Sequence, residues 1–222
     1  MPTSALGAAF NDYQRRSMVA LLDLPSDNHK LAFCVACGER NAHLLFSCLA
    51  GKEMYSDAQY IIGEIWKTAT KTECESDSIG LLAIKAQELC ARMMEQDPPL
   101  PEEAAIFCDI IQNAIQYGQT RDIAFAKKCG SWSLEAVKEC LKRKYTQQLW
   151  AELGPDWIAS NKHSSDYTKL MNGIDDKIAN DPAFMNEIAA QISVLRVLKD
   201  HSTVSVDCVS SVRDHVHGSL GL

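Results

Sequence analysis

The sequence lacks the patterns that mark several large classes of protein. Period-two alternation of apolar and polar residues is nearly absent, so we expect helices and little or no sheet. No apolar stretch approaches the length of about 18 residues that a membrane-spanning helix needs. The first ten residues lack the basic start and apolar middle of a signal peptide. We therefore expect a soluble, cytoplasmic protein with no membrane partner.

Excess positive charge is also missing. The chain has 22 Lys and Arg against 29 Asp and Glu, a net charge of -7 and a pI near 5.4. Binding to nucleic acid relies on a basic surface, so no nucleic-acid partner is expected. An acidic chain meets a basic protein more readily, although many cytoplasmic proteins are acidic for solubility alone.

Local catalytic motifs are missing as well. The sequence contains no G-x-S-x-G, no G-x-x-x-x-G-K-[ST] and no H-E-x-x-H. This argues against an enzyme and against a bound cofactor. An enzyme built from carboxylates that are scattered in the sequence stays open, because helical enzymes need not carry a local motif.

What the sequence does contain is apolar residues at spacings of three and four along almost its whole length. Hydrophobic residues make up 46% and charged residues 23%, which is ordinary for a globular protein. These features predict an all-α fold, a compact bundle of about eight to ten helices, with residues 1–222 in a single domain.

Helix boundaries are predicted from capping residues and helix breakers. Ser56 followed by Gln59 has the pattern of a capping box and predicts a helix start. Gly130 predicts a helix end, and Ser133 predicts the cap of a long helix after it.

Further along the chain, Gly154 and Pro155 predict the end of this long helix, and residues 155–164 are expected to be an irregular connection. Asp181 followed by Pro182 predicts the start of the next helix, with aspartate as the cap and proline at the first position.

Nine cysteines, an odd number without an export signal, are typical of reduced thiols. Cys34 and Cys37 form a C-x-x-C pair, which could be a redox site or half of a zinc site. Cys48 alone does not supply a second ligand pair. Because the pair lies inside an apolar helical stretch, we expect both thiols to be small buried hydrophobes.

Two further arrangements could bind a metal. His215 and His217 form an H-x-H, and Glu39 with His43 lies at i, i+4 on one helix. Isolated pairs of this kind are common by chance, so surface or packed histidines are expected and no metal site is predicted.

Charge is unevenly distributed along the chain. Residues 121–144 hold seven cations and three acids, whereas acids gather in residues 73–77, 95–109 and 175–181. These acids are either solvated helix faces or a surface that attracts a basic protein. The candidate partner-binding residues are Glu95, Asp97, Glu102, Glu103, Asp109, Asp175, Asp176 and Asp181.

The blocks that carry a family resemblance are residues 32–40, 65–66, 181–184 and 192–198. Together they resemble the YjaG-like family of bacterial helical proteins of unknown function. The family tends to have a Pro and a Tyr soon after its Glu-Arg pair, which Glu39 and Arg40 match, whereas here the helical pattern continues. The resemblance implies a compact helical bacterial protein and transfers no catalytic residue. The Glu-Arg pair itself is explained by a structural ion pair as readily as by a site.

Two functional hypotheses follow. The first is a non-enzymatic binding module, in its concrete form an immunity protein that neutralises a bacterial toxin through an acidic surface, with a signalling adaptor or regulatory protein as the alternative. The second is a metal-dependent or redox enzyme whose residues meet only in the folded chain.

Overall fold

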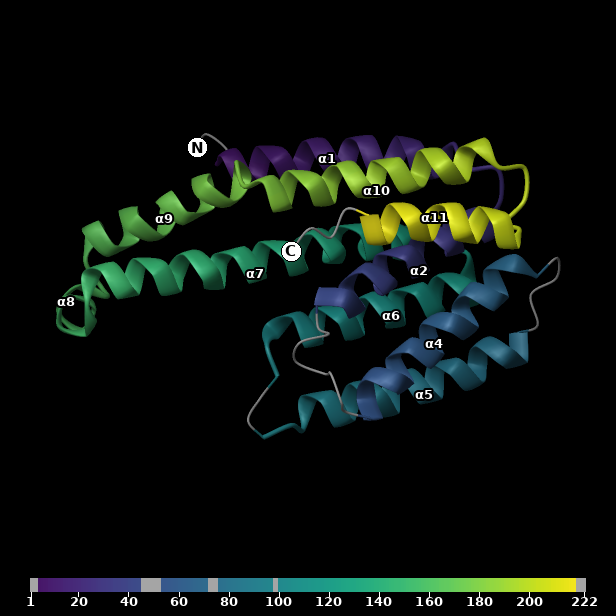
Figure 1. The fold of residues 1–222 in the computed structure, drawn as a ribbon, viewed down its shortest axis with the longest axis horizontal. Coiled ribbons are helices and arrows are strands. Elements are labelled where there is room, and N and C mark those ends of the chain that lie inside the picture. Colours follow the sequence, from purple (N-terminus) through teal and green to yellow (C-terminus); the bar gives the residue numbers. More distant parts are fainter. Residues whose placement is uncertain (1–3, 45–52, 72–75, 98–99, 219–222) are drawn as a thin grey trace.

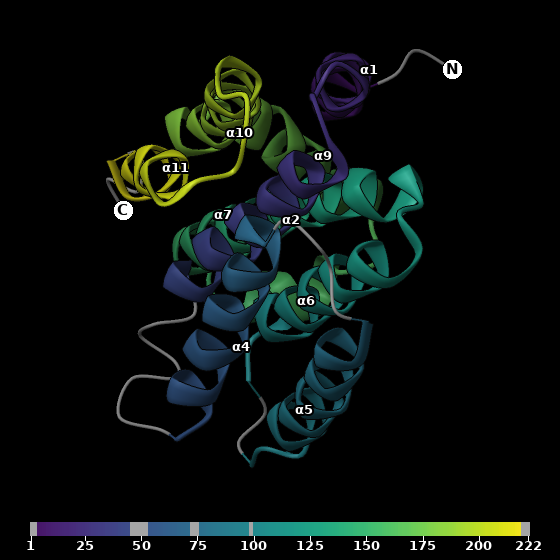
Figure 2. The ribbon, with the colours of Figure 1, turned by 90° about the vertical axis from the view of Figure 1, so that its right-hand side faces the viewer.

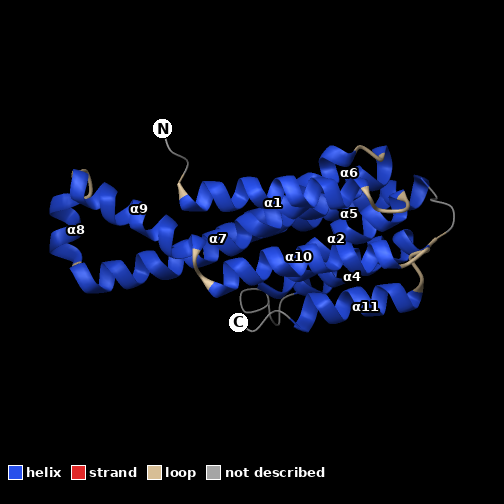
Figure 3. Cartoon of the chain, turned by 90° about the horizontal axis from the view of Figure 1, so that it is seen from above, coloured by secondary structure: helices blue, strands red, loops and turns tan. Residues whose placement is uncertain are grey.

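The computed structural model describes residues 4–44, 53–71, 76–97 and 100–218. Within these ranges it contains ten helices and no strand, which confirms the predicted all-α fold. Figures 1 and 3 show how the helices are arranged. The helices are α1 (Ala5–Leu22), α2 (Asp27–Leu44), α4 (Glu53–Thr70), α5 (Ser76–Met94), α6 (Glu102–Thr120), α7 (Ile123–Leu153), α8 (Pro155–Asn161), α9 (Ser165–Ala179), α10 (Pro182–Asp200) and α11 (Val206–Gly218). None of them is long and apolar enough to cross a membrane.

Helix α2 lies at the centre of the structure. Every residue from 31 to 42 is buried, and α2 contacts α4, α6, α7, α10 and α11. A helix that is apolar on all sides is expected inside a protein, and residues 31–37 of α2 are apolar without interruption. The buried stretch 31–42 includes three polar residues, Glu39, Arg40 and Asn41.

The remaining helices surround α2 unevenly. Helices α1 and α10 lie at one edge of the molecule and α5 lies at the opposite edge in both Figure 1 and Figure 2. The second half of α7 extends beyond the body and, with α8 and α9, forms an arm (Figures 1 and 3). Helix α8, at the tip of this arm, has no buried residue.

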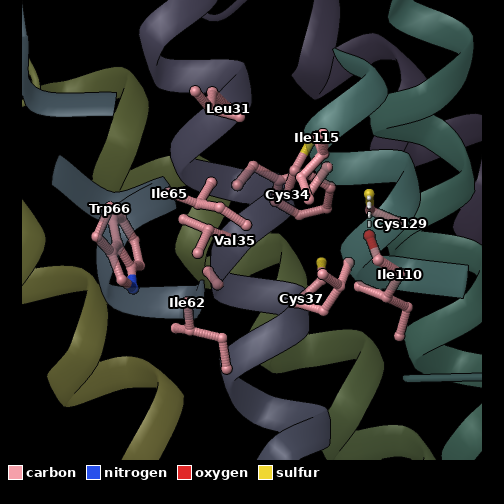
Figure 4. Packing of buried hydrophobic residues seen from close by; sticks show 14 of the residues in the cluster. Leu31, Cys34, Val35, Cys37, Ile62, Ile65, Trp66, Ile110, Ile115 and Cys129 are labelled. Carbon is pink, nitrogen blue, oxygen red and sulfur yellow. Dashed lines mark hydrogen bonds between the residues drawn. The ribbon is translucent and has the colours of Figure 1, made fainter. Parts of the chain in front are cut away.

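Two groups of buried side chains form the core. The larger surrounds α2 and joins it to α4, α5, α6 and α11 through residues such as Val35, Ile62 and Ile110 (Figure 4). The smaller lies between α1, α7, α9 and α10 and is built on Tyr13 and Phe184. Burial of apolar area of this kind is the dominant stabilising contribution to a fold.

The predicted helix end at Gly130 is wrong, because α7 continues through it and through Ser133. A Cβ atom at position 130 would contact the hydroxyl of Tyr13 and would lie 3.0 Å from Oε1 of Gln191. Glycine therefore serves here to let α1 and α10 approach α7 closely. Ser133 is buried and is a core residue of the helix instead of its cap.

Other boundary predictions have mixed outcomes. Helix α4 already begins at Glu53, so the predicted start at Ser56 is wrong, and residues 155–164 include the short helix α8 instead of being irregular throughout. Gly154, with φ 78°, ends α7 as predicted. Asp181 caps α10 as predicted, because its side chain accepts a hydrogen bond of 2.7 Å from the backbone N–H of Ala183.

Candidate functional site

The adjacent residues Glu39 and Arg40 of α2 make contacts in two different directions. The carboxylate of Glu39 accepts a hydrogen bond of 2.7 Å from Nε1 of Trp66 and forms an ion pair of 3.1 Å with Arg213 of α11. The guanidinium of Arg40 donates to Oε2 of Glu187 on α10 at 3.0 Å and to the carbonyl oxygen of Val216 at 2.9 Å. The Glu-Arg pair thus ties α2 to α4, α10 and α11.

A network of hydrogen bonds continues from Glu187. Its Oε1 accepts from the hydroxyl of Ser133 at 2.9 Å and from Nε2 of Gln191 at 2.7 Å. Asn41 donates to Ser133 at 2.8 Å, and the hydroxyl of Tyr13 donates to Gln191. The network connects α1, α2, α7 and α10, and sequence reasoning missed it because its members lie far apart in the chain.

The chemistry of this network is structural. The carboxylate of Glu187 is neutralised by Arg40, and both side chains are only 3% exposed. Burial raises the pKa of the Tyr13 phenol well above its ordinary value, so this hydroxyl stays protonated. Five of the grooves and cavities in the described part of the chain have none of these charged residues in their walls. The groups are therefore arranged to hold helices together.

Cys34 and Cys37 are buried in α2 and are free thiols, which confirms their expected burial (Figure 4). Burial raises the pKa of Cys37 well above its ordinary value and does the same for the neighbouring Cys129. The thiolate is the reactive form of cysteine, so Cys37 and Cys129 are held as unreactive thiols. Cys48, considered above as a further ligand, lies outside the described residues.

The described candidate metal ligands are not part of a larger ligand cluster. In the part of the chain that the structure describes, no three His, Cys, Asp or Glu side chains are arranged to hold a metal ion. Nδ1 of His215 lies 2.9 Å from the carbonyl oxygen of Ser211, and Glu39 is occupied by Trp66 and Arg213. The side chain of His217 is outside the described set.

Two of the eight acidic candidates are buried. Glu103 is 2% exposed and accepts two hydrogen bonds from Arg143 of α7, at 3.0 and 2.5 Å. Asp181 is 7% exposed, caps α10 and accepts a hydrogen bond of 2.5 Å from Tyr145. Both carboxylates are part of the helix packing, so neither belongs to an exposed partner-binding surface.

The other six candidates form two separate groups. Asp175 and Asp176 lie on α9, in the arm, and α7 lies between this helix and α6 (Figure 1). The second group is at the junction of α5 and α6 and is called the acidic junction below. It consists of the exposed Glu95, Asp97 and Glu102 and of the half-buried Asp109, which lies two turns further along α6.

The acidic junction differs from the buried acids in its contacts. Among the described residues, none of its four carboxylates forms an ion pair. Burial raises the pKa of Asp109 above its ordinary value, and no neighbouring charge offsets this effect. Among the described residues, the acidic junction thus has negative charge with no ion-pair partner.

The structure also contains grooves that the sequence did not predict. One, of about 640 Å³, lies between α1 and α7 and has Phe10, Trp132, Lys127 and Lys128 in its wall. Another, of about 480 Å³, lies between α1 and α10. The helices that form each groove are distant in sequence, so only a tertiary prediction could have found these sites.

Comparison with protein-family models, with curated proteins and with solved structures finds no match to this chain. The fold and its surfaces define an all-helical protein with a buried polar network, an acidic junction and apolar grooves.

Proposed function

We propose that the protein is a non-enzymatic binding module that holds a basic protein partner against the acidic junction. The observation that carries the proposal is that Glu95, Asp97 and Glu102 are exposed where α5 ends and α6 begins, and that these three and Asp109, two turns further along α6, form no ion pair among the described residues. Uncompensated charge of one sign attracts a partner of opposite charge and accelerates the encounter.

In its concrete form, the proposal is an immunity protein that binds a bacterial toxin in the cytoplasm. A toxin that acts on a polyanionic substrate presents a basic cleft, and a cluster of carboxylates can occupy this cleft or pair with its basic rim.

The buried polar groups support a binding role over a catalytic one. Arg40, Glu187, Ser133 and Gln191 bond with one another inside the protein. A catalytic group must instead reach a substrate within hydrogen-bond distance. The described surface includes exposed acids, grooves and exposed apolar side chains, which are features of surfaces that bind other proteins.

The test begins with the two reading frames that flank the gene. Each frame is expressed from an inducible promoter in a bacterial host, and growth is measured with and without this protein. The proposal predicts that one frame arrests growth and that co-expression of this protein restores it. Two harmless frames, or a growth arrest that this protein leaves unchanged, would contradict the immunity function.

A matched pair of variants then tests the surface. Both variants change the net charge equally, and all six positions are exposed. The acidic-junction variant is Glu95→Lys with Asp97→Lys and Glu102→Gln, and the control variant is Glu152→Lys with Asp200→Lys and Asp214→Asn. We expect the first to lose rescue and the second to keep it. Equal rescue by both would remove the acidic junction from the proposal.

A further inference from the structure

The groove between α1 and α10 is a second candidate binding surface. The two helices run side by side in the same direction (Figures 1 and 3), as the contacts of Tyr13 with Gln191 and of Asp23 with Lys199 also require. The apolar part of its wall is formed by Val19 and Ala20 on α1 and by two residues of α10, Ile192 and Leu195. The wall runs from Arg15 to Asp23 on α1 and from Ile192 to Lys199 on α10, so the groove is about 12 Å long, a little over two turns of a helix.

Cations line both sides of this groove. Arg15 and Arg16 lie on α1, and Arg196 and Lys199 lie on α10. Asp12 pairs with both α1 arginines, at 2.7 and 3.5 Å, and Asp23 pairs with Lys199 at 3.0 Å. These pairs are exposed and therefore weak, so a carboxylate of another protein can replace the internal partner. Arg196 has no ion pair among the described residues.

Exposed apolar side chains extend the apolar wall of the groove onto the surface of α1. Val19 is 58% exposed and Leu22 is 60% exposed, and the two lie at i, i+3 on one face of α1. Apolar contact surface between two rows of cations fits a helix that has an apolar stripe with acids on both flanks. A single small anion would contact the cations on one side of the groove only and would leave its apolar wall without a contact.

We propose that this surface, the α1–α10 groove, binds an acidic amphipathic helix of a partner protein. It lies at the edge of the molecule opposite α5 (Figure 2), so it is separate from the acidic junction and has the opposite charge. The inference therefore does not depend on the proposed function.

The experiment uses the full chain and two synthetic peptides of about 18 residues, each a five-turn helix. Both carry the same leucine stripe and a fluorescent label, and they differ only in having Glu or Lys on the flanks. Fluorescence anisotropy should show saturable binding of the Glu peptide, weaker at high ionic strength, and no binding of the Lys peptide. Equal binding of both peptides, or no binding of the Glu peptide, would overturn the proposal.

Variants locate the binding. Arg15→Glu with Arg196→Glu reverses one charge on each side of the groove and should lower the affinity for the Glu peptide by about tenfold or more. Val19→Asp, at an exposed position, should weaken it too, since it removes apolar contact without a buried cavity. Lys144→Glu with Lys162→Glu, an equal change of charge on the arm, should leave affinity unchanged. Loss of affinity only in the arm variant would overturn the assignment.

The oligomeric state of the chain is the remaining readout. Light scattering after size exclusion should give the same mass for the wild type and for Arg15→Glu with Arg196→Glu. A dimer that this double variant dissociates would assign the groove to a second copy of the chain, and the proposed foreign helix would be wrong.

Discussion

At the scale of single residues, the ion pair between Arg40 and Glu187 links α2 to α10 inside the protein. Both groups are buried, and a buried charge is tolerated only when it is paired and hydrogen-bonded. Glu187 also accepts hydrogen bonds from Ser133 and Gln191. Removal of its carboxylate therefore leaves one cation and two donors without their acceptor.

We predict that Glu187→Ala lowers the free energy of unfolding by about 3 to 5 kcal/mol, the cost of leaving one buried charge without its partner. Urea denaturation followed by circular dichroism measures this change. Lys67→Ala, which removes the cation of an exposed pair with Glu64, serves as the control and should change stability by about 1 kcal/mol or less. Similar losses in the two variants would show that Glu187 is not a central contact.

Asp109 gives a prediction with a defined pH dependence. Burial raises its pKa above the ordinary value of 3.8, because the charged carboxylate is less stable in the folded protein than in water. Folding is therefore most favourable below pH 3.8, where the carboxyl is protonated, and this advantage is lost as pH rises through the folded-state pKa. Asp109→Asn removes the cost of burying a charged carboxylate and should therefore raise the melting temperature at neutral pH. The increase should shrink in acid, where the wild-type carboxyl is protonated in both states.

Melting curves of wild type and Asp109→Asn at about pH 7 and about pH 3 test the sign. A difference that is larger in acid than at neutral pH would contradict the assignment. A stabilising substitution that also weakens partner binding is the expected pattern for a residue kept for function.

At the scale of helices, the crossing of α1, α7 and α10 depends on Gly130. We predict that Gly130→Ala destabilises the protein by about 1 to 3 kcal/mol, because the added methyl group overlaps Tyr13 and Gln191. Gly63→Ala in α4 is the matched control, since nothing lies within 4 Å of its Cβ position. It should stabilise by about 0.5 to 1 kcal/mol. Equal effects in thermal denaturation would show that α1 and α10 do not pack closely at Gly130.

Helix positions were more predictable than helix contacts. The apolar spacing identified the all-α fold, and the local capping signal at Asp181 and Pro182 was correct because its chemistry involves neighbouring residues. Gly130 has the composition of a helix end, yet its role comes from side chains on two other helices.

The candidate site was predictable only in part, for the same reason. The acids at 95, 97 and 102, predicted to bind a partner, are exposed. Glu103 follows Glu102 directly, yet the helical turn points it at Arg143, 40 residues away. The partner of Arg40 is 147 residues away in the sequence. Neither pairing leaves a local pattern.

At the scale of the whole molecule, the net charge of -7 is unevenly distributed, with acids and cations gathered on different surfaces. Uncompensated acids lie at the α5–α6 junction, and cations line the α1–α10 groove near the opposite edge (Figure 2). A module with two oppositely charged surfaces can hold two partners at once. The surfaces should respond to salt independently, since charges separated by more than the screening length, about 8 Å at physiological salt, do not interact strongly.

The association rate with a basic partner found by the growth test addresses the central claim most directly. Stopped-flow mixing should give a rate constant that falls as salt screens the field, and that falls further for the acidic-junction variant. The dissociation rate should change less, because rim charges act mainly on the encounter. An association rate that is unaffected by both salt and the acidic-junction variant would contradict the claim that this surface receives the partner.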